Sequence, residues 1–524
     1  MAQIEIENLT FTYAGADKAA VKNISLKVNE GDFIVVCGKS GCGKSTLLRS
    51  MKPAIRPFGK AEGKVLYGGK DIDEIGEREQ AESIGFVMQN PEHQIVTDKV
   101  WHELAFGPES LGMKPEEIRL RVAEMSEYFG IGGWYFESVD KLSGGQKQLL
   151  NLAAVMAMHP KIMILDEPTA QLDPIAAESF LDTLNKINKD LGITIVLSEH
   201  RLNQVLDYAD KVLVMQEGKA ILCDTPKNTV SLIKDRELLK LMPVPSQLFQ
   251  ICRGHGEIPL SVSEGRKWIN SLELESKEER ESFFKTSCEN IEREIALECK
   301  NLWFRYERSG ADIINGLNLK IEKGEVFAIL GGNGCGKTTT MSLLSQINKP
   351  YRGKLNVNGK ISALPQNVQT LFHKETVREE VCNVPNKIIE KLELSKLLDR
   401  HPYDLSGGEQ QRLALSKVLA ANPDILLLDE PTKGIDSIYK EKLGGILEQL
   451  KSEGKTIVIV SHDVDFCGEF ADRCGLFANG SIIAVNNYRD FFSGNRFYTT
   501  TVNKMAASKI KSAVRKEDII RCQK

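Results

Sequence analysis

One glycine-rich stretch organises the chain, and it reads Gly38-Lys39-Ser40-Gly41-Cys42-Gly43-Lys44-Ser45-Thr46. An apolar run, 33–37, precedes it and Leu47-Leu48-Arg49 follows, so the local order is strand, glycine loop and helix. The three glycines tolerate the left-handed backbone angles with which successive N–H groups surround a phosphate. The following helix points its positive end at the same place. The stretch therefore predicts a site for a di- or triphosphate.

Two side chains of this loop have specific predicted contacts. Lys44 reaches the β- and γ-phosphates, and the hydroxyl of Ser45 ligates Mg²⁺. The alternative is a glycine turn without a ligand, which the flanking strand and helix disfavour. The residues predicted to surround the nucleotide are Gly38, Ser40, Gly41, Cys42, Gly43, Lys44, Ser45 and Thr46.

The motif occurs a second time, after the apolar run 326–330. A long-range repeat of this kind indicates two nucleotide-binding units in one chain. The second set of predicted nucleotide contacts comprises Gly331, Asn333, Gly334, Cys335, Gly336, Lys337, Thr338 and Thr339.

The composition fits a large protein with two domains. The chain has 524 residues, 68 Lys and Arg against 72 Asp and Glu, and a net charge of −4, so no overall basic surface recruits nucleic acid. No apolar run approaches the roughly 18 residues of a membrane span, and no signal peptide opens the chain. The 11 cysteines contain no C-x-x-C pair. This pattern is typical of a reduced, cytosolic protein, with room for association at a membrane surface.

Alternating apolar residues upstream of each glycine loop predict antiparallel strands. In the first half Ile4 and Ile6 alternate with glutamates, and 24–28 alternates again before a turn. Tyr13 and Tyr306 lie at matching places in the two halves. Either aromatic ring could stack on adenine, or could simply be a half-buried strand residue.

Further motifs follow each glycine loop in the same order. They are a glutamine after a strand, a serine with paired glycines before a helix, a buried strand that ends in Asp-Glu, and a histidine after another strand. Serine and glycine at a helix start form an anion-binding arrangement. In the first half these residues are Gln89, Ser143-Gly144-Gly145, Asp166-Glu167 and His200; in the second they are Gln366, Ser406-Gly407-Gly408, Asp429-Glu430 and His462.

This order, found twice, resembles the ATP-binding cassette (ABC) ATPases, with Walker A, Q-loop, LSGGQ signature, Walker B, D-loop and H-loop in both halves. The resemblance implies an α/β fold of two tandem P-loop NTPase domains. Each has a mixed sheet core, an antiparallel β subdomain and a helical signature subdomain. It also implies ATP and Mg²⁺ as ligands and hydrolysis of ATP as the activity.

The resemblance also implies roles for the motif residues. The metal ligands are Ser45, Gln89, Asp166, Thr338, Gln366 and Asp429, and the catalytic residues are Glu167, His200, Glu430 and His462. Each glutamate polarises a water and each histidine contacts the γ-phosphate. In this family two cassettes pack head to tail, so Ser406-Gly407-Gly408 closes over the nucleotide at Lys44, and Ser143-Gly144-Gly145 over that at Lys337. Fusion of the cassettes makes this closure intramolecular.

Both halves keep the full set of motifs, so we expect two competent sites. Two departures in the second half, Glu409 in place of the usual signature glutamine and Pro365 before Gln366, put the rate and coupling of that half in question. Cys42 and Cys335 are either activated thiols beside a helix N-terminus and a lysine, or small filler residues.

Four segments are expected along the chain. They are a first cassette at 1–242, a charged connector at 243–294, a second cassette at 295–495 and a basic C-terminal tail at 496–524. The connector is expected to be solvated and partly helical. The tail is expected to be mobile, with contact to a membrane or partner as the alternative.

The stretch from Gln89 to Glu109 resembles that of energy-coupling factor (ECF) transporter ATPases. This likeness implies a prokaryotic importer of vitamins or metal ions. The chain would sit peripherally on the cytoplasmic side of the cell membrane, with a separate transmembrane coupling subunit and a substrate-binding membrane subunit, and no nucleic acid. The alternative is a soluble tandem ABC ATPase acting on ribosomes or nucleic acid, which an acidic connector disfavours.

We further expect the first cassette to make the stronger connection to the membrane subunit. The apolar contacts expected there are Trp101, Leu104 and Phe106, around Glu103 and Glu109. The second cassette offers a shorter stretch, 367–384, whose main apolar candidates are Leu371, Phe372 and Val377. Charge reversal at Glu103 is accordingly expected to uncouple uptake more than the change at Glu379.

Overall fold

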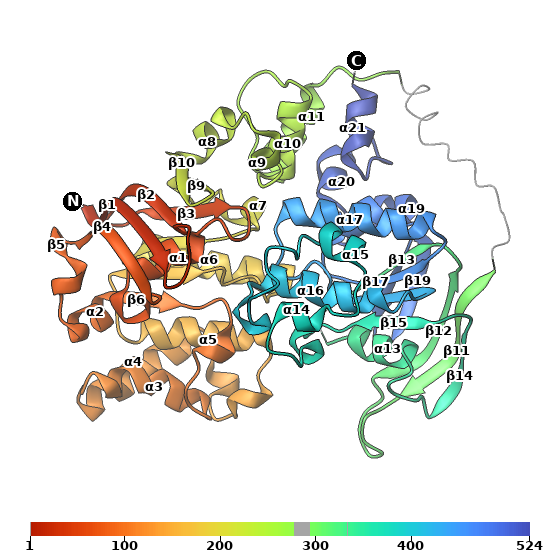
Figure 1. Ribbon diagram of the computed structural model, residues 1–524, viewed down its shortest axis with the longest axis horizontal. Coiled ribbons are helices and arrows are strands. Elements are labelled where there is room, and N and C mark those ends of the chain that lie inside the picture. The colour runs from red at the N-terminus through yellow and green to blue at the C-terminus, as the bar shows by residue number, and fades with distance from the viewer. Residues whose placement is uncertain (1, 277–293, 333, 524) are drawn as a thin grey trace. The chain divides into compact units, whose positions relative to one another are not determined.

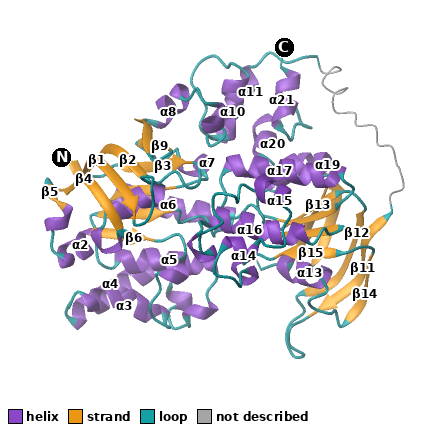
Figure 2. Cartoon of the chain, viewed as in Figure 1, coloured by secondary structure: helices purple, strands orange, loops and turns teal. Residues whose placement is uncertain are grey.

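A computed structural model describes residues 2–276, 294–332 and 334–523 (Figures 1 and 2). The chain divides into two compact units, Met1–Pro243 and Val244–Lys524. Asn333 and residues 277–293 of the expected connector lie outside the described residues.

The first unit is built on two sheets. A four-stranded antiparallel sheet has the strand order β2-β1-β4-β5, and a six-stranded mixed sheet has the order β10-β9-β3-β8-β7-β6. In the larger sheet only β10 is antiparallel to its neighbour. The strands are β1 (Ala2–Tyr13), β2 (Val21–Asn29), β3 (Phe33–Gly38), β4 (Gly59–Tyr67), β5 (Lys70–Asp71), β6 (Ile84–Val87), β7 (Ile162–Asp166), β8 (Thr194–Ser198), β9 (Lys211–Gln216) and β10 (Lys219–Asp224).

The apolar alternation that predicted antiparallel strands is confirmed. Ile4 and Ile6 of β1 lie opposite Val28 and Leu26 of β2, and all four are buried. They share one core with Leu47 of helix α1 and with one face of the six-stranded sheet. The polar residues between them face solvent, as expected for a strand with one buried face.

Helices of the first unit cover the large sheet and form a separate helical subdomain, in which α3 packs on α4 and α5. The helices are α1 (Lys44–Ser50), α2 (Glu77–Ser83), α3 (Val100–Ser110), α4 (Pro115–Tyr128), α5 (Gly144–Met156), α6 (Pro174–Leu191), α7 (Leu202–Val205), α8 (Pro226–Leu232) and α9 (Arg236–Leu239).

The second unit repeats this plan. Its smaller antiparallel sheet has the order β12-β11-β14 and its larger mixed sheet the order β15-β16-β17-β13-β18-β19. The strands are β11 (Ile295–Phe304), β12 (Ile314–Glu322), β13 (Val326–Leu330), β14 (Arg352–Val357), β15 (Ile361–Leu364), β16 (Ile425–Asp429), β17 (Thr456–Val460), β18 (Arg473–Ala478) and β19 (Ser481–Asn487). The fold of two tandem α/β cassettes is therefore as expected.

Two cores lie on the two faces of this larger sheet. One joins the sheet to β11, β12 and α13, and the other joins it to α16 and α17. The helices are α10 (Val244–Ile251), α11 (Val262–Ser271), α13 (Lys337–Leu344), α14 (Val377–Glu380), α15 (Asn386–Lys391), α16 (Gly407–Ala420), α17 (Ser437–Ser452), α18 (Val464–Phe470), α19 (Tyr488–Gly494), α20 (Thr501–Ala506) and α21 (Lys516–Cys522).

The expectation of a mobile C-terminal tail is wrong. Residues 501–522 contain α20 and α21, which pack on α10 and α11 of the connector (Figure 1). The apolar core of this helical group contains Phe249 and Trp268 from the connector with Met505 and Ile519 from the tail. Lys504, Lys509, Lys511 and Arg521 of the tail are exposed, whereas Arg515 and Lys516 are half-buried. Composition alone could not show this, because the partner helices lie far away in sequence.

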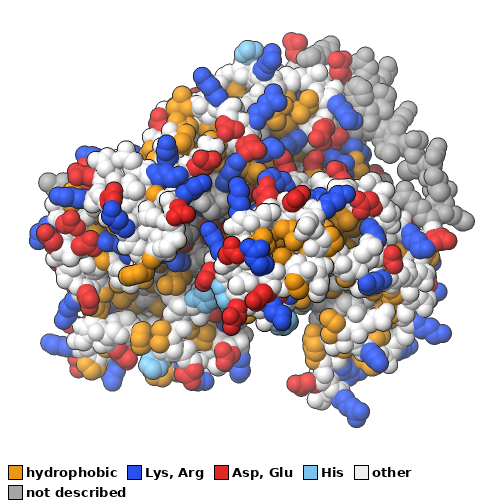
Figure 3. Space-filling model, viewed as in Figure 1, with side chains coloured by type: hydrophobic (Ala, Val, Ile, Leu, Met, Phe, Trp, Pro, Cys, Tyr) orange, Lys and Arg blue, Asp and Glu red, His pale blue; other side chains and the backbone are white. Residues whose placement is uncertain are grey.

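Among the described residues, no helix is both long enough and apolar enough to cross a bilayer. Side chains of both charge signs are interspersed over the face in Figure 3, in keeping with the small net charge.

Candidate active sites

The first glycine loop connects β3 to α1 and requires glycine for steric reasons. A Cβ atom on Gly43 would lie 2.4 Å from the carbonyl oxygen of Ala20, and one on Gly38 would lie 2.3 Å from that of Met215. Gly43 also has a φ of 104°, a conformation that other residues rarely adopt. Gly38 and Gly43 therefore pack directly on neighbouring backbone, which leaves no room for a side chain at either position. The equivalent Gly336 in the second unit has a φ of 111°.

The two loop lysines lie across their own loops. Lys44 Nζ donates to the carbonyl oxygens of Gly38 and Lys39 at 3.1 and 3.3 Å. Lys337 Nζ donates to those of Gly331 and Gly332 at 3.0 and 2.8 Å. Each ammonium is nearly buried, so a nearby phosphate would gain a strong charge interaction in a poorly solvated place.

In each unit, the hydroxyl residue and the aspartate expected to bind Mg²⁺ are next to each other, Ser45 with Asp166 and Thr338 with Asp429. Ser45 Oγ donates to Asp166 Oδ1 at 3.0 Å, at the end of β7. In the second unit, Asp429 Oδ1 is buried without a hydrogen-bond partner among the described residues. An unpaired buried carboxylate oxygen fits a cation ligand, because Mg²⁺ prefers oxygen and commonly takes one or two protein ligands together with phosphate and water. The described residues hold no cluster of three or more His, Cys, Asp or Glu that could bind a metal without those additions.

Glu167 is the centre of the polar contacts in the first site. His200 Nε2 lies 2.7 Å from its Oε1, and Gln89 Nε2 donates to its Oε2 at 2.8 Å. Lys44 Nζ lies 3.6 Å from Oε1. The structure therefore brings the Q-loop, Walker A, Walker B and H-loop residues of the first unit together on one carboxylate.

The second site is arranged more loosely around Glu430. His462 Nε2 lies 3.2 Å from Glu430 Oε1 and 3.4 Å from Lys337 Nζ. Gln366 is exposed, and the described residues show no hydrogen bond between it and Glu430. The second unit thus assembles its histidine and glutamate but does not bring in its glutamine.

Both glutamates are held in a strained backbone conformation. Glu167 has a φ of 45° and Glu430 a φ of 51°. Non-glycine residues persist in this region only when their surroundings fix them, and such residues concentrate at functional sites. Hydrogen bonds from Glu167 N to Ser198 O and from Glu430 N to Val460 O supply that constraint.

The surroundings of the two glutamates shift their pKa values in opposite directions. Burial alone would raise the pKa of Glu167, but His200 and Lys44 outweigh it and lower the pKa to about 2. At Glu430 burial dominates and raises the pKa to about 7, although the backbone N–H of His462 and the charge of Lys337 oppose it.

This difference predicts different pH profiles for the two sites. A general base must be ionised, so lowering the pH from 8 to 6 through a pKa of about 7 should reduce kcat/KM at the second site about tenfold. The first site should be unchanged in this window, because Glu167 stays ionised. Variants with one active site, His200→Ala and His462→Ala, separate the two profiles. Parallel profiles in the two variants would contradict the prediction.

Sequence reasoning missed Glu199. This residue is buried, accepts hydrogen bonds from the backbone N–H groups of His200 and Arg201 at 2.8 and 3.0 Å, and receives another from Thr169 Oγ1 at 2.6 Å. It therefore ties the H-loop to the segment after Walker B. A comparison of the two halves could have found this residue, because the first half has Ser-Glu-His where the second has Val-Ser-His.

The signature serines lie at helix starts, as expected. Ser143 begins α5 in a capping box with Gln146, and Ser406 begins α16 in a capping box with Glu409. Glu409 thus performs the capping that glutamine performs in the first unit. Among the described residues, no hydrogen bond joins either serine to the glycine loop of its own unit. Closure over the other unit's nucleotide remains a prediction.

The two tyrosines are oriented by a hydrogen bond to the glycine-loop helix. Tyr13 Oη lies 2.8 Å from Thr46 Oγ1, and Tyr306 Oη lies 3.3 Å from Thr339 Oγ1. The rings remain partly exposed beside the loop. This placement is compatible with stacking on a base, which stays a prediction.

The hypothesis of an activated thiol is not supported at Cys42. This residue is buried, and burial raises the pKa of its thiol despite the nearby Lys44. Its Sγ also occupies space close to Gly38. The structure favours the interpretation of Cys42 as a small filler residue.

Comparison with known proteins places these sites in context. A family model described as "ABC transporter" matches residues 21–170 and 314–433. A curated protein of Bacillus thuringiensis subsp. konkukian, provisionally named as an ABC transporter ATP-binding protein, is 39% identical over 99% of this chain and 98% of its own length.

Two solved structures are also similar. An archaeal ribosome recycling factor, solved with a ribosomal stalk protein, is 20% identical over 93% of this chain and 91% of its own, with a TM-score of 0.60. At this identity the likeness concerns the fold alone. The protein cbiO1 of Clostridium perfringens, part of the ABC transporter complex cbiONQ, is 33% identical over 46% of this chain and 95% of its own, with a TM-score of 0.41.

Proposed function

Because the chain belongs to the ABC transporter family of ATP-binding proteins, we propose that it is the ATP-hydrolysing subunit of an ECF-type importer. In this proposal separate membrane subunits bind and carry the substrate, and this chain binds them at the cytoplasmic face of the cell membrane. ATP hydrolysis at two composite sites drives the transport.

At each site the proposed division of labour follows the geometry above. Lys44 and the loop N–H groups hold the phosphates, and Ser45 with Asp166 holds Mg²⁺, which supplies charge neutralisation when bound. Glu167 accepts a proton from the attacking water, and His200 orients that carboxylate. The corresponding residues of the second unit take the same roles, and each site is completed by the signature serine and glycines of the other unit.

The observation that best supports the transport proposal is a surface groove beside the first Q-loop. It has a volume of about 710 Å³ and lies where α3 meets the loop before it. Phe106 of α3 is 38% exposed in it and Trp101 is 40% exposed nearby. The lining residues are Val96, Thr97, Asp98, His102, Phe106, Glu109 and Ser110. A groove with apolar contacts and a charged rim fits an amphipathic cytoplasmic helix of a membrane subunit.

The groove is connected to the first ATP site by hydrogen bonds. Gln94 accepts a bond from Met88 N at 2.8 Å and donates to Phe86 O at 2.9 Å, so it fixes the groove loop to β6. The same strand leads directly to Gln89, which contacts Glu167. A change at the nucleotide can therefore reach the groove through one short segment.

The second cassette differs at this place in a way that supports the expected asymmetry. Glu103 and Glu380 occupy equivalent positions, because each is buried and accepts backbone hydrogen bonds from the loop before its helix. Counting from these two residues, Trp101 corresponds to Arg378 and Phe106 to Asn383. The second cassette thus has polar residues where the first has exposed aromatic rings.

The structure corrects the sequence-based expectation for the apolar contacts and for Glu103. Leu104 is buried in the core and cannot contact a partner, and Phe372 and Val377 of the second cassette are buried as well. Glu103 fixes the groove loop from within, so its reversal would distort the loop. Its counterpart is Glu380 and not Glu379.

Site-specific photo-crosslinking tests the proposal. A benzoyl-phenylalanine at position 106 should crosslink the full chain, in its native cells, to an integral membrane protein that resists alkaline extraction. The same probe at Phe58, which is more exposed but lies directly before β4 of the antiparallel sheet, should not. Crosslinks from position 106 to ribosomal proteins would instead establish the alternative, a soluble ATPase that acts on ribosomes.

A further inference from the structure

Helix α18 begins close to the second histidine. The helix begins at Val464, two residues after His462, and its N-cap is Asp463. His462 Nε2 in turn lies within 3.2 Å of Glu430 Oε1. Because the link between histidine and helix is so short, a shift of α18 would move the imidazole relative to the glutamate.

The C-terminal segment binds the first turn of α18. Asp465 accepts two hydrogen bonds from Thr501, one from its backbone N–H and one from its hydroxyl, both at 2.7 Å. Thr501 is the first residue of α20. One residue of the tail thus satisfies both oxygens of a carboxylate that lies three positions after the histidine.

The same segment also binds the other end of α18. Arg515 Nε donates to Gly468 O at 3.0 Å and its Nη2 donates to Ala471 O at 3.4 Å, so the guanidinium caps the helix C-terminus. A Cβ atom on Gly468 would lie 2.3 Å from the methyl group of Thr500. The tail therefore packs directly on the backbone of this helix.

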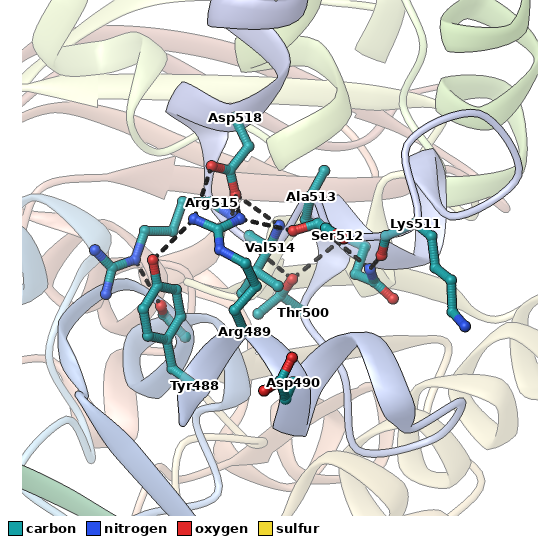
Figure 4. A network of polar contacts seen from close by, with 12 residues as sticks. Tyr488, Arg489, Asp490, Thr500, Lys511, Ser512, Ala513, Val514, Arg515 and Asp518 are labelled. Carbon is teal, nitrogen blue, oxygen red and sulfur yellow. Dashed lines mark hydrogen bonds and ion pairs between the residues drawn. The ribbon is translucent and has the colours of Figure 1, made fainter. Parts of the chain in front are cut away.

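A network of charged and backbone contacts keeps the tail in this position (Figure 4). Asp518 forms an ion pair with Arg489 of α19 at 3.1 Å and accepts the N–H groups of Val514 and Arg515. Thr500 Oγ1 donates to Val514 O at 2.8 Å. The Arg515 guanidinium lies 3.9 Å above the ring centre of Tyr488. Arg515 and Asp518 are thus fixed to α19 of the second cassette.

The first unit positions its histidine by other means. There the buried Glu199 ties His200 N to Thr169 within the motif itself. In the second unit Ser461 occupies that place, and its Oγ lies 3.4 Å from Thr432 Oγ1. The ties within the second motif run through a neutral hydroxyl and the glutamate itself: Ser461 Oγ accepts the N–H of Asp463 at 3.0 Å, and His462 N donates to Glu430 Oε2 at 3.3 Å. In addition, the tail holds the adjoining helix.

We propose that the C-terminal segment 499–523 positions His462 for ATP hydrolysis in the second site, with Thr501 and Arg515 as the positioning residues. The segment acts through its hydrogen bonds to α18. This inference rests on the role proposed for His462 and is independent of the proposed transport function.

The proposal is distinct from a purely stabilising role of the tail. Val514 does belong to an apolar core with Cys467 and Phe491, so removal of the tail would damage the fold. A positioning role instead predicts a selective loss of kcat at one site, with retained ATP affinity, because Lys337 and Tyr306 bind the nucleotide from other elements.

The test uses Thr501→Val in the full chain, which removes one hydroxyl and keeps the backbone bond to Asp465. In a His200→Ala background, where the second site alone turns over, kcat should fall about fivefold with KM and the affinity for a fluorescent ATP analogue unchanged. Thr501→Ser should restore kcat, because it returns the hydroxyl. In a His462→Ala background, where the first site alone turns over, Thr501→Val should have no effect.

Arg266→Ala provides the matched control. Arg266 of α11 holds the tail through Lys504 O and contacts no part of α18, so its loss should leave kcat of the second site unchanged. An unchanged kcat in Thr501→Val, an equal fall at both sites, or a parallel loss of ATP affinity would each overturn the proposal. If His462→Ala leaves the second site active, His462 is not needed for hydrolysis there. The present inference, which depends on that role, would then be wrong as well.

Discussion

Replacement of both Glu167 and Glu430 by glutamine is expected to lower ATP turnover by about a hundredfold or more, while ATP binding is retained. Each glutamate follows the aspartate at the end of a buried strand and contacts the histidine of its own unit at 2.7 or 3.2 Å. Glutamine preserves the shape of the side chain and one accepting oxygen, but it is uncharged and cannot accept a proton from water. The loss should therefore appear in kcat and not in affinity.

The measurement is steady-state phosphate release beside equilibrium binding of a fluorescent ATP analogue. The two single variants serve as internal controls, because each leaves the glutamate of the other site intact. Each single variant should lose turnover at its own site, and only the double variant should lose it at both. A double variant that hydrolyses ATP at the wild-type rate would remove the assignment of both glutamates.

The part of the fold that could be predicted is local in origin. The glycine loop is specified by contacts such as that between Gly43 and Ala20, which leave no space for a side chain. Ile4 and Ile6 face the core because alternate residues of a strand point the same way. Both features depend on residues that are close in sequence, so they can be recognised in the sequence itself. The same features occur in both halves of the chain, which strengthens the prediction.

The tail could not be predicted because its structure depends on distant partners. Helices α20 and α21 are six and seven residues long, too short to be stable alone. They are held by Trp268 and Phe249, which precede the second cassette, and by the ion pair between Arg489 and Asp518. Read alone, the same residues show only an excess of lysine and arginine, which is equally typical of a mobile segment.

Site residues that belong to a sequence motif could be predicted. Residues whose role depends on a contact made only in the folded chain were missed. Glu199 and Glu103 resemble exposed acidic residues in the sequence, yet both are buried and accept backbone hydrogen bonds. A buried carboxylate of this kind is recognised only when its donors are known, because burial without partners would be strongly unfavourable. The different environments of Glu167 and Glu430 were hidden for the same reason.

Replacement of Phe106 by glutamate is expected to reduce substrate uptake about thirtyfold while ATP hydrolysis by the isolated chain is unchanged. Phe106 is the exposed aromatic ring of the groove, and a buried aromatic anchor of an interface commonly contributes enough affinity for a change of this size. A carboxylate in its place would have to lose its hydration against the membrane subunit. The substitution leaves Gln94 and Glu103, which fix the groove loop, in place.

Asn383→Glu is the matched control, because Asn383 occupies the equivalent position in the second cassette and the same charge is introduced there. Uptake into cells that express the complete transporter, measured beside ATPase activity of the purified chain, should fall far more for Phe106→Glu than for Asn383→Glu. Equal losses would mean that both cassettes couple alike, and that the exposed rings of the first groove have no special part. A loss of ATPase activity in Phe106→Glu would show that the groove is needed for the fold of the site itself. A loss of uptake for Phe106→Glu alone is the result expected if the membrane subunit is coupled to the first ATP site through the loop that joins the groove to Gln89.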